Sequence, residues 1–137
     1  MTTALSNCLK LEADSIRASA NNLSHKEVES ALNILEECKN NKSKIVITWV
    51  GKSGIVARKI AATFSSVGLM SIYLNPLDAV HGDLGIVAQK DVVMLLSNSG
   101  ETQEIVNIIP HLKVSETKLI GLLGKIDSSI GKKCDSV

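Results

Sequence analysis

The sequence has very few aromatic residues: its 137 residues include one Trp, one Tyr and one Phe. Proteins that bind single-stranded nucleic acid without sequence preference stack the bases on exposed rings, so the composition argues against that class. The formal net charge is only +1 at pH 7, which gives no field strong enough to attract a polyanion. A small anionic metabolite needs only local donors, and such a ligand therefore stays open.

Cysteines and long apolar runs are also scarce. Cys8, Cys38 and Cys134 form no Cys-x-x-Cys pair, and an odd, widely spaced set is a poor disulfide framework. No secretion signal opens the chain, and no apolar run is long enough to span a bilayer. Hydrophobic residues nevertheless make up 45% of the chain, which is enough for the core of one domain. We expect a cytoplasmic protein with reduced thiols and no nucleic-acid or membrane partner.

Two helices are predicted in residues 1–42, which we treat as an N-terminal helical segment. Apolar residues recur at helical spacing over residues 3–20, although the stripe is only partly apolar. Ser24 and Glu27 then predict a capping box at the start of a second helix. This segment either packs on a neighbouring subunit or covers the sheet of its own chain.

Short apolar runs alternate with helices in residues 43–137. The runs read as buried strands at 45–50, 70–74, 91–96 and 118–123. The helices between them are predicted at about 51–67 and 101–113. In the first of these, the residues expected to face inward are Val56, Ile60, Phe64 and Val67. A short helix at about 127–132 precedes what reads as the start of a fifth strand at 134–137. This order predicts an α/β domain, a flavodoxin-like parallel sheet of about five strands flanked by helices.

Two polar, glycine-containing turns follow the first and third predicted strands. They are Gly51-Lys52-Ser53-Gly54 and Ser97-Asn98-Ser99-Gly100-Glu101-Thr102. Each turn opens a helix, so each offers free backbone N–H groups and the positive end of a helix dipole. Ser and Thr are common helix caps, which is the plainer interpretation. Three hydroxyls with a glycine in one turn fit a phosphate monoester better.

Two nucleotide-binding motifs are excluded by single residues. A P-loop requires a glycine where this chain has Val46, and a dinucleotide fingerprint requires one where it has Trp49. The end of the second strand carries Asn75 instead of the acidic residue that binds a ribose. We therefore predict no nucleotide cofactor.

Three ionisable residues near the turns are candidates for chemistry on a sugar. Lys52 could neutralise a phosphate or polarise a sugar oxygen, or it could be a solvated loop lysine. Glu101 could move a proton between carbons, although a carboxylate in a first helical turn is common for dipole reasons alone. His81 lies in a turn-rich stretch and titrates near neutral pH, which suits ring opening.

Four stretches resemble the arabinose-5-phosphate isomerases of the sugar isomerase (SIS) family. They are Val50-Gly51-Lys52-Ser53-Gly54, residues 58–66, His81-Gly82-Asp83-Leu84-Gly85 and Ser97-Asn98-Ser99-Gly100-Glu101-Thr102. These enzymes interconvert ribulose 5-phosphate and arabinose 5-phosphate through an enediol, on the route to the Kdo sugar of lipopolysaccharide. The resemblance implies a homodimer or homotetramer. It also implies catalytic roles for Lys52, His81 and Glu101. The implied substrate- and phosphate-binding residues are Ser53, Ser97, Asn98, Ser99, Gly100, Thr102 and Gly68.

The chain departs from the family pattern in three places. Trp49 stands where a glycine is usual, beside the first turn, and Asn75 stands where a histidine is usual, so we predict no metal site. The family also continues with the rest of the fifth strand, further helices, another Glu and His, and often a pair of CBS modules. We therefore expect a C-terminally short chain with little turnover. The alternatives are a non-catalytic, sugar-phosphate-binding regulatory domain and a hexulose-phosphate isomerase.

Overall fold

The structure is a computed structural model that describes residues 2–113 and 116–137. The strands are β1 (Ile45–Thr48), β2 (Ser71–Leu74), β3 (Val92–Ser97) and β4 (Lys118–Leu123). The α-helices are α1 (Thr2–Asn22), α2 (His25–Asn40), α3 (Gly51–Ser66), α4 (Pro76–Ala79) and α5 (Gln103–Leu112). The described residues also include the short 3₁₀ helices η1 (Asp83–Ile86) and η3 (Gly131–Lys133). The alternation of strands and helices predicted for residues 43–137 is confirmed.

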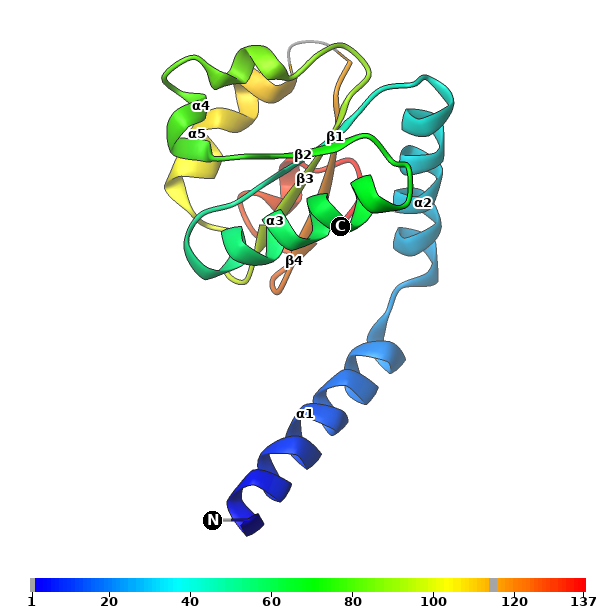
Figure 1. Ribbon diagram of the computed structural model, residues 1–137, viewed down its shortest axis with the longest axis vertical. Coiled ribbons are helices and arrows are strands. Elements are labelled where there is room, and N and C mark those ends of the chain that lie inside the picture. The colour runs from blue at the N-terminus through cyan, green and yellow to red at the C-terminus, as the bar shows by residue number, and fades with distance from the viewer. Residues whose placement is uncertain (1, 114–115) are drawn as a thin grey trace.

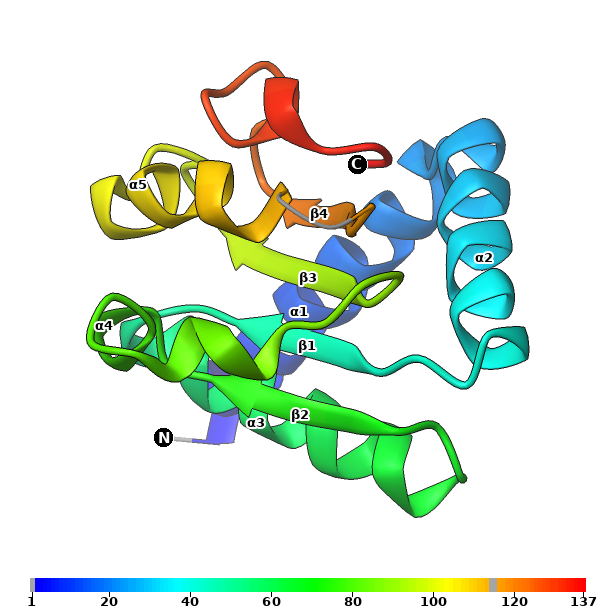
Figure 2. The same ribbon diagram turned by 90° about the horizontal axis from the view of Figure 1, so that it is seen from above.

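All strands of the sheet run parallel, in the order β2-β1-β3-β4. The connection from β1 to β2 carries α3, and the connection from β3 to β4 carries α5. Because parallel crossovers are right-handed and these two run in opposite directions, they place their helices on opposite faces. Figure 1 shows α3 on one face and α4 and α5 on the other. The carboxyl ends of the strands point toward α4 and α5 (Figure 2).

The two N-terminal helices behave differently. Helix α2 packs on the sheet of its own chain through Cys38, which is buried, and lies beside the amino-terminal ends of the strands (Figure 2). Helix α1 has no buried residue and projects away from the domain (Figure 1). Helix α2 therefore covers the sheet of its own chain, while the packing of α1 on a neighbouring subunit stays a prediction. Among the described residues no helix is both long enough and apolar enough to cross a bilayer.

Helix α3 meets the sheet through small side chains. Its buried residues are Gly54, Ala57 and Ala61. Val56 and Val67, which we expected to face inward, are 52% and 69% exposed. Small residues let a helix approach the strands closely, and this stripe lies to one side of the larger apolar residues. Helix α5 instead packs through large side chains, since Ile105, Ile109 and Leu112 are buried.

The last residues reach the sheet at a single point. Ser136 forms a parallel bridge with Ile120 of β4, so the predicted fifth strand is present only as this bridge. Glu27 holds the segment from α2: its Oε2 accepts hydrogen bonds from the Ser136 hydroxyl at 3.2 Å and from the Val137 N–H at 3.1 Å. The predicted capping box is therefore half right. The Glu27 N–H donates to Ser24 Oγ, but the Glu27 carboxylate binds the distant segment instead of its own helix start.

Candidate functional site

The two glycine-containing turns lie at the topological switch point, where the chain connections run to opposite sides of the sheet. The chain leaves β1 toward β2 on one side and leaves β3 toward β4 on the other, while β1 and β3 are neighbours. Thr48 pairs with Leu95, two residues before the end of β3 at Ser97. Neighbouring strands are about 4.8 Å apart, so the turns that follow lie side by side. Ligands of open parallel sheets bind at such a switch point.

The second turn presents hydroxyl groups at the start of α5. Ser97 Oγ accepts the Gly100 N–H at 2.7 Å, and Ser99 Oγ accepts the Glu101 N–H at 3.3 Å. A hydroxyl that accepts a bond still has its own proton to donate. Thr102 is the N-cap of α5, yet its side chain makes no capping hydrogen bond. The turn can therefore donate several hydroxyl protons beside the free N–H groups of a ten-residue helix.

A loop after β4 supports this turn from behind. Gly100 has φ +69°, and an added Cβ would lie 2.1 Å from Ser128 Oγ. The Ile130 N–H donates to the Gly100 carbonyl at 3.1 Å. Only glycine fits this position, because both the backbone angle and the contact exclude a side chain. Sequence reasoning missed the role of Ser128 and Ile130, since no local pattern links them to a turn nearly thirty residues earlier.

The Glu101 side chain is turned toward the same loop. Its Oε1 accepts the Ser129 N–H at 2.8 Å. Hydrogen bonding from Ser129, with a smaller contribution from nearby lysines, lowers the pKa of Glu101 below its ordinary value. In this arrangement the carboxylate is ionised at neutral pH but weakly basic. Proton abstraction by Glu101 would require the Ser129 bond to be exchanged for a contact with the substrate.

The first turn opens α3 against β2. Gly51 has φ +61°, and an added Cβ on Gly54 would lie 2.9 Å from the Trp49 carbonyl oxygen, so both glycines are required. Trp49 is only 5% exposed. Its indole packs in the core, so the bulky ring that the sequence places beside the turn does not crowd it. Lys52 is exposed and Ser53 is half-buried.

His81 and Asn75 lie after β2. His81 is exposed and follows α4, and its N–H donates to the Asp78 carbonyl. In the described part of the chain, no hydrogen bond or ion pair joins His81, Lys52 and Glu101 to one another. Asn75 caps α4, accepting the Leu77 N–H at 3.1 Å. Within residues 2–113 and 116–137, no group of three or more His, Cys, Asp or Glu could hold a metal ion.

Gly68 lies apart from the other predicted binding residues. It follows the carboxyl end of α3, where its N–H donates to the Ser65 carbonyl. It lines a pocket with Ser43 and Met70, which precede β1 and β2. This is the amino-terminal edge of the sheet, opposite the Ser97–Thr102 turn. The structure therefore separates Gly68 from the candidate site. With φ +85°, Gly68 terminates helix α3.

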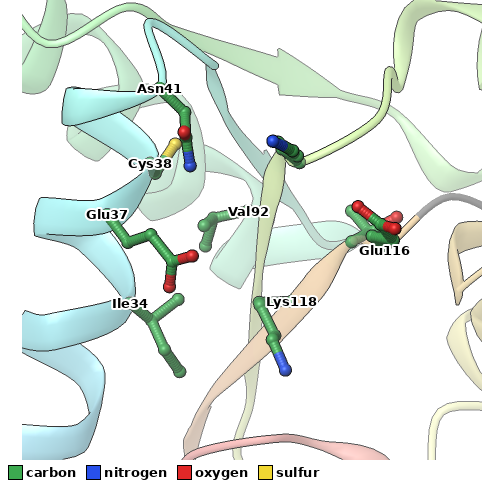
Figure 3. Close-up of a pocket in the computed structure, with 9 residues that line it drawn as sticks. Ile34, Glu37, Cys38, Asn41, Val92, Glu116 and Lys118 are labelled. Carbon is green, nitrogen blue, oxygen red and sulfur yellow. The ribbon is translucent and has the colours of Figure 1, made fainter.

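Another pocket also lies at the amino-terminal edge, between α2 and the first residues of β3 and β4. Figure 3 shows Glu37 and Cys38 of α2 across from Val92 and Lys118, and the pocket has a volume of about 370 Å³. Its lining contains none of the predicted site residues. It is therefore separate from the switch-point turns.

Comparison with known proteins shows the family of the chain. The SIS domain profile matches residues 37–137. The arabinose 5-phosphate isomerase KdsD of Escherichia coli K12 is 47% identical over 94 residues, covering 69% of this chain and 29% of KdsD. KpsF of E. coli O6:H1, also an arabinose 5-phosphate isomerase, is 32% identical over 137 residues, covering all of this chain and 41% of KpsF. The chain thus spans about a third of the length of these relatives.

Solved structures extend the comparison to the fold. The E. coli CFT073 protein c3406, solved in complex with arabinose 5-phosphate, has a TM-score of 0.83 and 40% identity, covering 99% of this chain and 72% of that one. A Bacteroides fragilis protein, described as a candidate phosphosugar isomerase involved in capsule formation, has a TM-score of 0.87 and 33% identity. The match covers 97% of this chain and 71% of that one. With its parallel sheet, its paired turns and these similarities, the chain belongs to the SIS-domain family.

Proposed function

We propose that this chain binds a sugar phosphate where β1 and β3 end side by side. The phosphate would be held by Ser53 and by the turn from Ser97 to Thr102, with Asn98 and Gly100 contributing to the turn. The observation that carries this proposal is the free Thr102 hydroxyl at the start of α5, together with the Ser97 and Ser99 hydroxyls that still have protons to donate. The relative solved with arabinose 5-phosphate supports the same ligand class.

The reaction we propose is the interconversion of arabinose 5-phosphate and ribulose 5-phosphate. A base removes the proton from C2 of the aldose while the C1 oxygen gains a proton, which gives an enediol. Loss of the proton on the C2 oxygen and return of a proton to C1 then give the ketose. Lys52 would stabilise the developing oxygen charge, His81 would assist ring opening, and Glu101 would move the carbon-bound proton. The 47% identity to KdsD over 94 residues supports this choice of substrate.

The experiment that tests catalysis is hydrogen exchange in deuterated water, followed by NMR at C2 of arabinose 5-phosphate. We expect the wild-type chain to catalyse exchange slowly, as the expected low turnover implies, and Glu101→Gln to reduce that rate by roughly 10²–10⁴-fold. Glu104→Gln is the control, since Glu104 lies three residues after Glu101, in the first turn of α5. Exchange at the normal rate in Glu101→Gln would assign the base elsewhere.

A non-catalytic binding domain is the second candidate, and the bond between Glu101 and Ser129 favours it. A carboxylate that is held by a backbone N–H and has a lowered pKa is suited to supporting the turn. Binding of arabinose 5-phosphate without any C2 exchange by the wild-type chain would select this alternative.

We also propose that the protein is a cytoplasmic homo-oligomer, a dimer or tetramer, in which α1 packs on a second copy. Helix α1 buries none of its residues in its own chain and exposes Leu5, Leu9 and Ile16. Most of the stability of helices in proteins comes from packing of an apolar face, so α1 calls for a packing partner. Sedimentation of the wild-type chain as a monomer would contradict this assembly.

A further inference from the structure

A groove begins at the first glycine-containing turn and runs past the end of β2. One section, of about 380 Å³, is lined by Val50 and Gly51 at one end and by Arg58, Tyr73 and Asn75 further along. A second section, of about 450 Å³, shares Arg58, Tyr73 and Asn75 and continues to Asp78, Gly82 and Asp83. Because the sections share three residues, they form one continuous groove.

Arg58 occupies the middle of this groove. Its guanidinium carbon lies 4.5 Å from the centroid of the Tyr73 ring. The ring is itself fixed, because Tyr73 Oη donates to the Trp49 carbonyl at 2.7 Å. In the part of the chain that the structure describes, Arg58 makes no ion pair. Its planar fork is therefore held in place by stacking while its N–H donors stay free for a ligand.

The far end of the groove supplies acceptors. Asp78 and Asp83 line it, and the Asn75 amide donates to Asp78 Oδ2 at 2.8 Å. A second anionic group would be repelled by these carboxylates. Sugar hydroxyls both donate and accept, so they can bond to carboxylates and to a guanidinium at once. The lining therefore fits a polyhydroxyl chain better than a phosphate.

We infer that this groove holds the hydroxyl-bearing part of the sugar phosphate, and that Arg58 is a specificity-determining residue for it. The inference rests on the proposed phosphate site at the Ser97–Thr102 turn. Since β1 lies between β2 and β3, the two ends of the site are about two strand spacings apart, roughly 10 Å. An open-chain sugar phosphate can extend from the turn across Gly51 into the groove.

Calorimetric titration with two ligands tests the inference. Arabinose 5-phosphate reports on both ends of the site, and inorganic phosphate reports on the turn alone. We expect Arg58→Met to weaken arabinose 5-phosphate roughly 10–100-fold, as for the loss of charge-assisted hydrogen bonds. Its affinity for inorganic phosphate should be unchanged. Lys59→Met is the matched control, because it removes the same charge from the next, exposed position of α3, which does not line the groove.

The possible outcomes are distinct. Equal weakening of both ligands by Arg58→Met, or no weakening of either, would overturn the role of Arg58. If Lys59→Met weakened the binding of arabinose 5-phosphate to the same extent, the effect of Arg58→Met would be explained by net charge alone. That result would also overturn the role of Arg58. If the wild-type chain bound neither ligand, the proposed function itself would fail. Arg58 is exposed, so its replacement should leave the circular dichroism spectrum intact, and Arg58→Lys should show an intermediate loss.

Discussion

The carboxylate of Glu101 accepts a hydrogen bond of 2.8 Å from the backbone N–H of Ser129. This bond ties the hydroxyl-rich turn after β3 to the loop after β4. Together with the bond from the Ile130 N–H to the Gly100 carbonyl, it fixes the turn from a segment that is remote in sequence. The geometry of the proposed phosphate site therefore depends on the loop at residues 128–131.

The Glu101 bond should make stability depend on pH. The folded-state pKa of Glu101 is lowered, so its contribution is present above the ordinary Glu pKa of about 4.3 and is lost as the pH falls through the lowered value. We expect Glu101→Gln to have a smaller unfolding free energy than wild type at pH 7. The gap should close in acid below about pH 4.

Urea denaturation at several pH values measures this gap. Glu104→Gln serves as the control, because Glu104 lies three residues after Glu101, in the first turn of α5, but makes no such bond within the described residues. A constant difference between Glu101→Gln and wild type from pH 7 to pH 3 would show that ionised Glu101 does not stabilise the turn.

Gly100→Ala should disrupt the turn. The added methyl would lie 2.1 Å from Ser128 Oγ and 2.5 Å from Ser128 Cβ, at a φ of +69°. We expect a loss of about 1–3 kcal/mol of unfolding free energy and weaker binding of inorganic phosphate. Ser128→Gly removes both clashing atoms, so the double variant should recover part of the loss and leave only the backbone strain. Equal stability of the single and double variants would contradict the clash.

A buried ion pair at the amino-terminal edge of the sheet should contribute far more to the unfolding free energy than an exposed one. Asp91 is 2% exposed and accepts from Lys44 Nζ at 2.5 Å and from the Ala88 N–H at 2.7 Å. Asp91→Ala leaves these donors unpaired, so we expect a loss of about 3–5 kcal/mol in thermal or urea unfolding. Asp14→Ala breaks the exposed pair with Arg17 and should cost under about 1 kcal/mol. Similar losses in the two variants would contradict the burial of Asp91.

The strands could be predicted because each is marked by a local run of apolar residues. Runs such as Ile45–Thr48 are β-branched and buried on both faces, and the observed bounds lie within two residues of the predicted ones. The switch point follows once strands and turns are known, because it depends on strand order and not on side-chain detail. For the same reason, the Ser97–Thr102 turn could be selected from sequence alone.

Long-range contacts could not be predicted in this way. A capping box is a local pattern, but Ser136 and Val137, more than a hundred residues away, compete for the Glu27 carboxylate. The inward face of α3 is predicted only in part: Ile60 and Phe64 pack against the core as expected, but Val56 and Val67 are exposed. Hydrophobic periodicity favours large residues, whereas close packing on β1 and β2 buries Gly54, Ala57 and Ala61. Trp49 was placed near the turn by its sequence position, yet burial places its indole in the core.

The central claim is that the hydroxyls at the start of α5 bind the phosphate of a sugar phosphate. Calorimetric titration of arabinose 5-phosphate into the wild-type chain and into the Ser99→Ala/Thr102→Ala variant tests it most directly. The control is Thr63→Ala/Ser66→Ala, which removes the same two hydroxyl types from α3, where they bond only to their own helix. Each lost charge-assisted bond should cost about 1.5–3 kcal/mol, so we expect affinity to fall by roughly 100-fold or more in the first variant and to stay unchanged in the control. Unchanged affinity in Ser99→Ala/Thr102→Ala, with the fold intact, would remove this turn from the site.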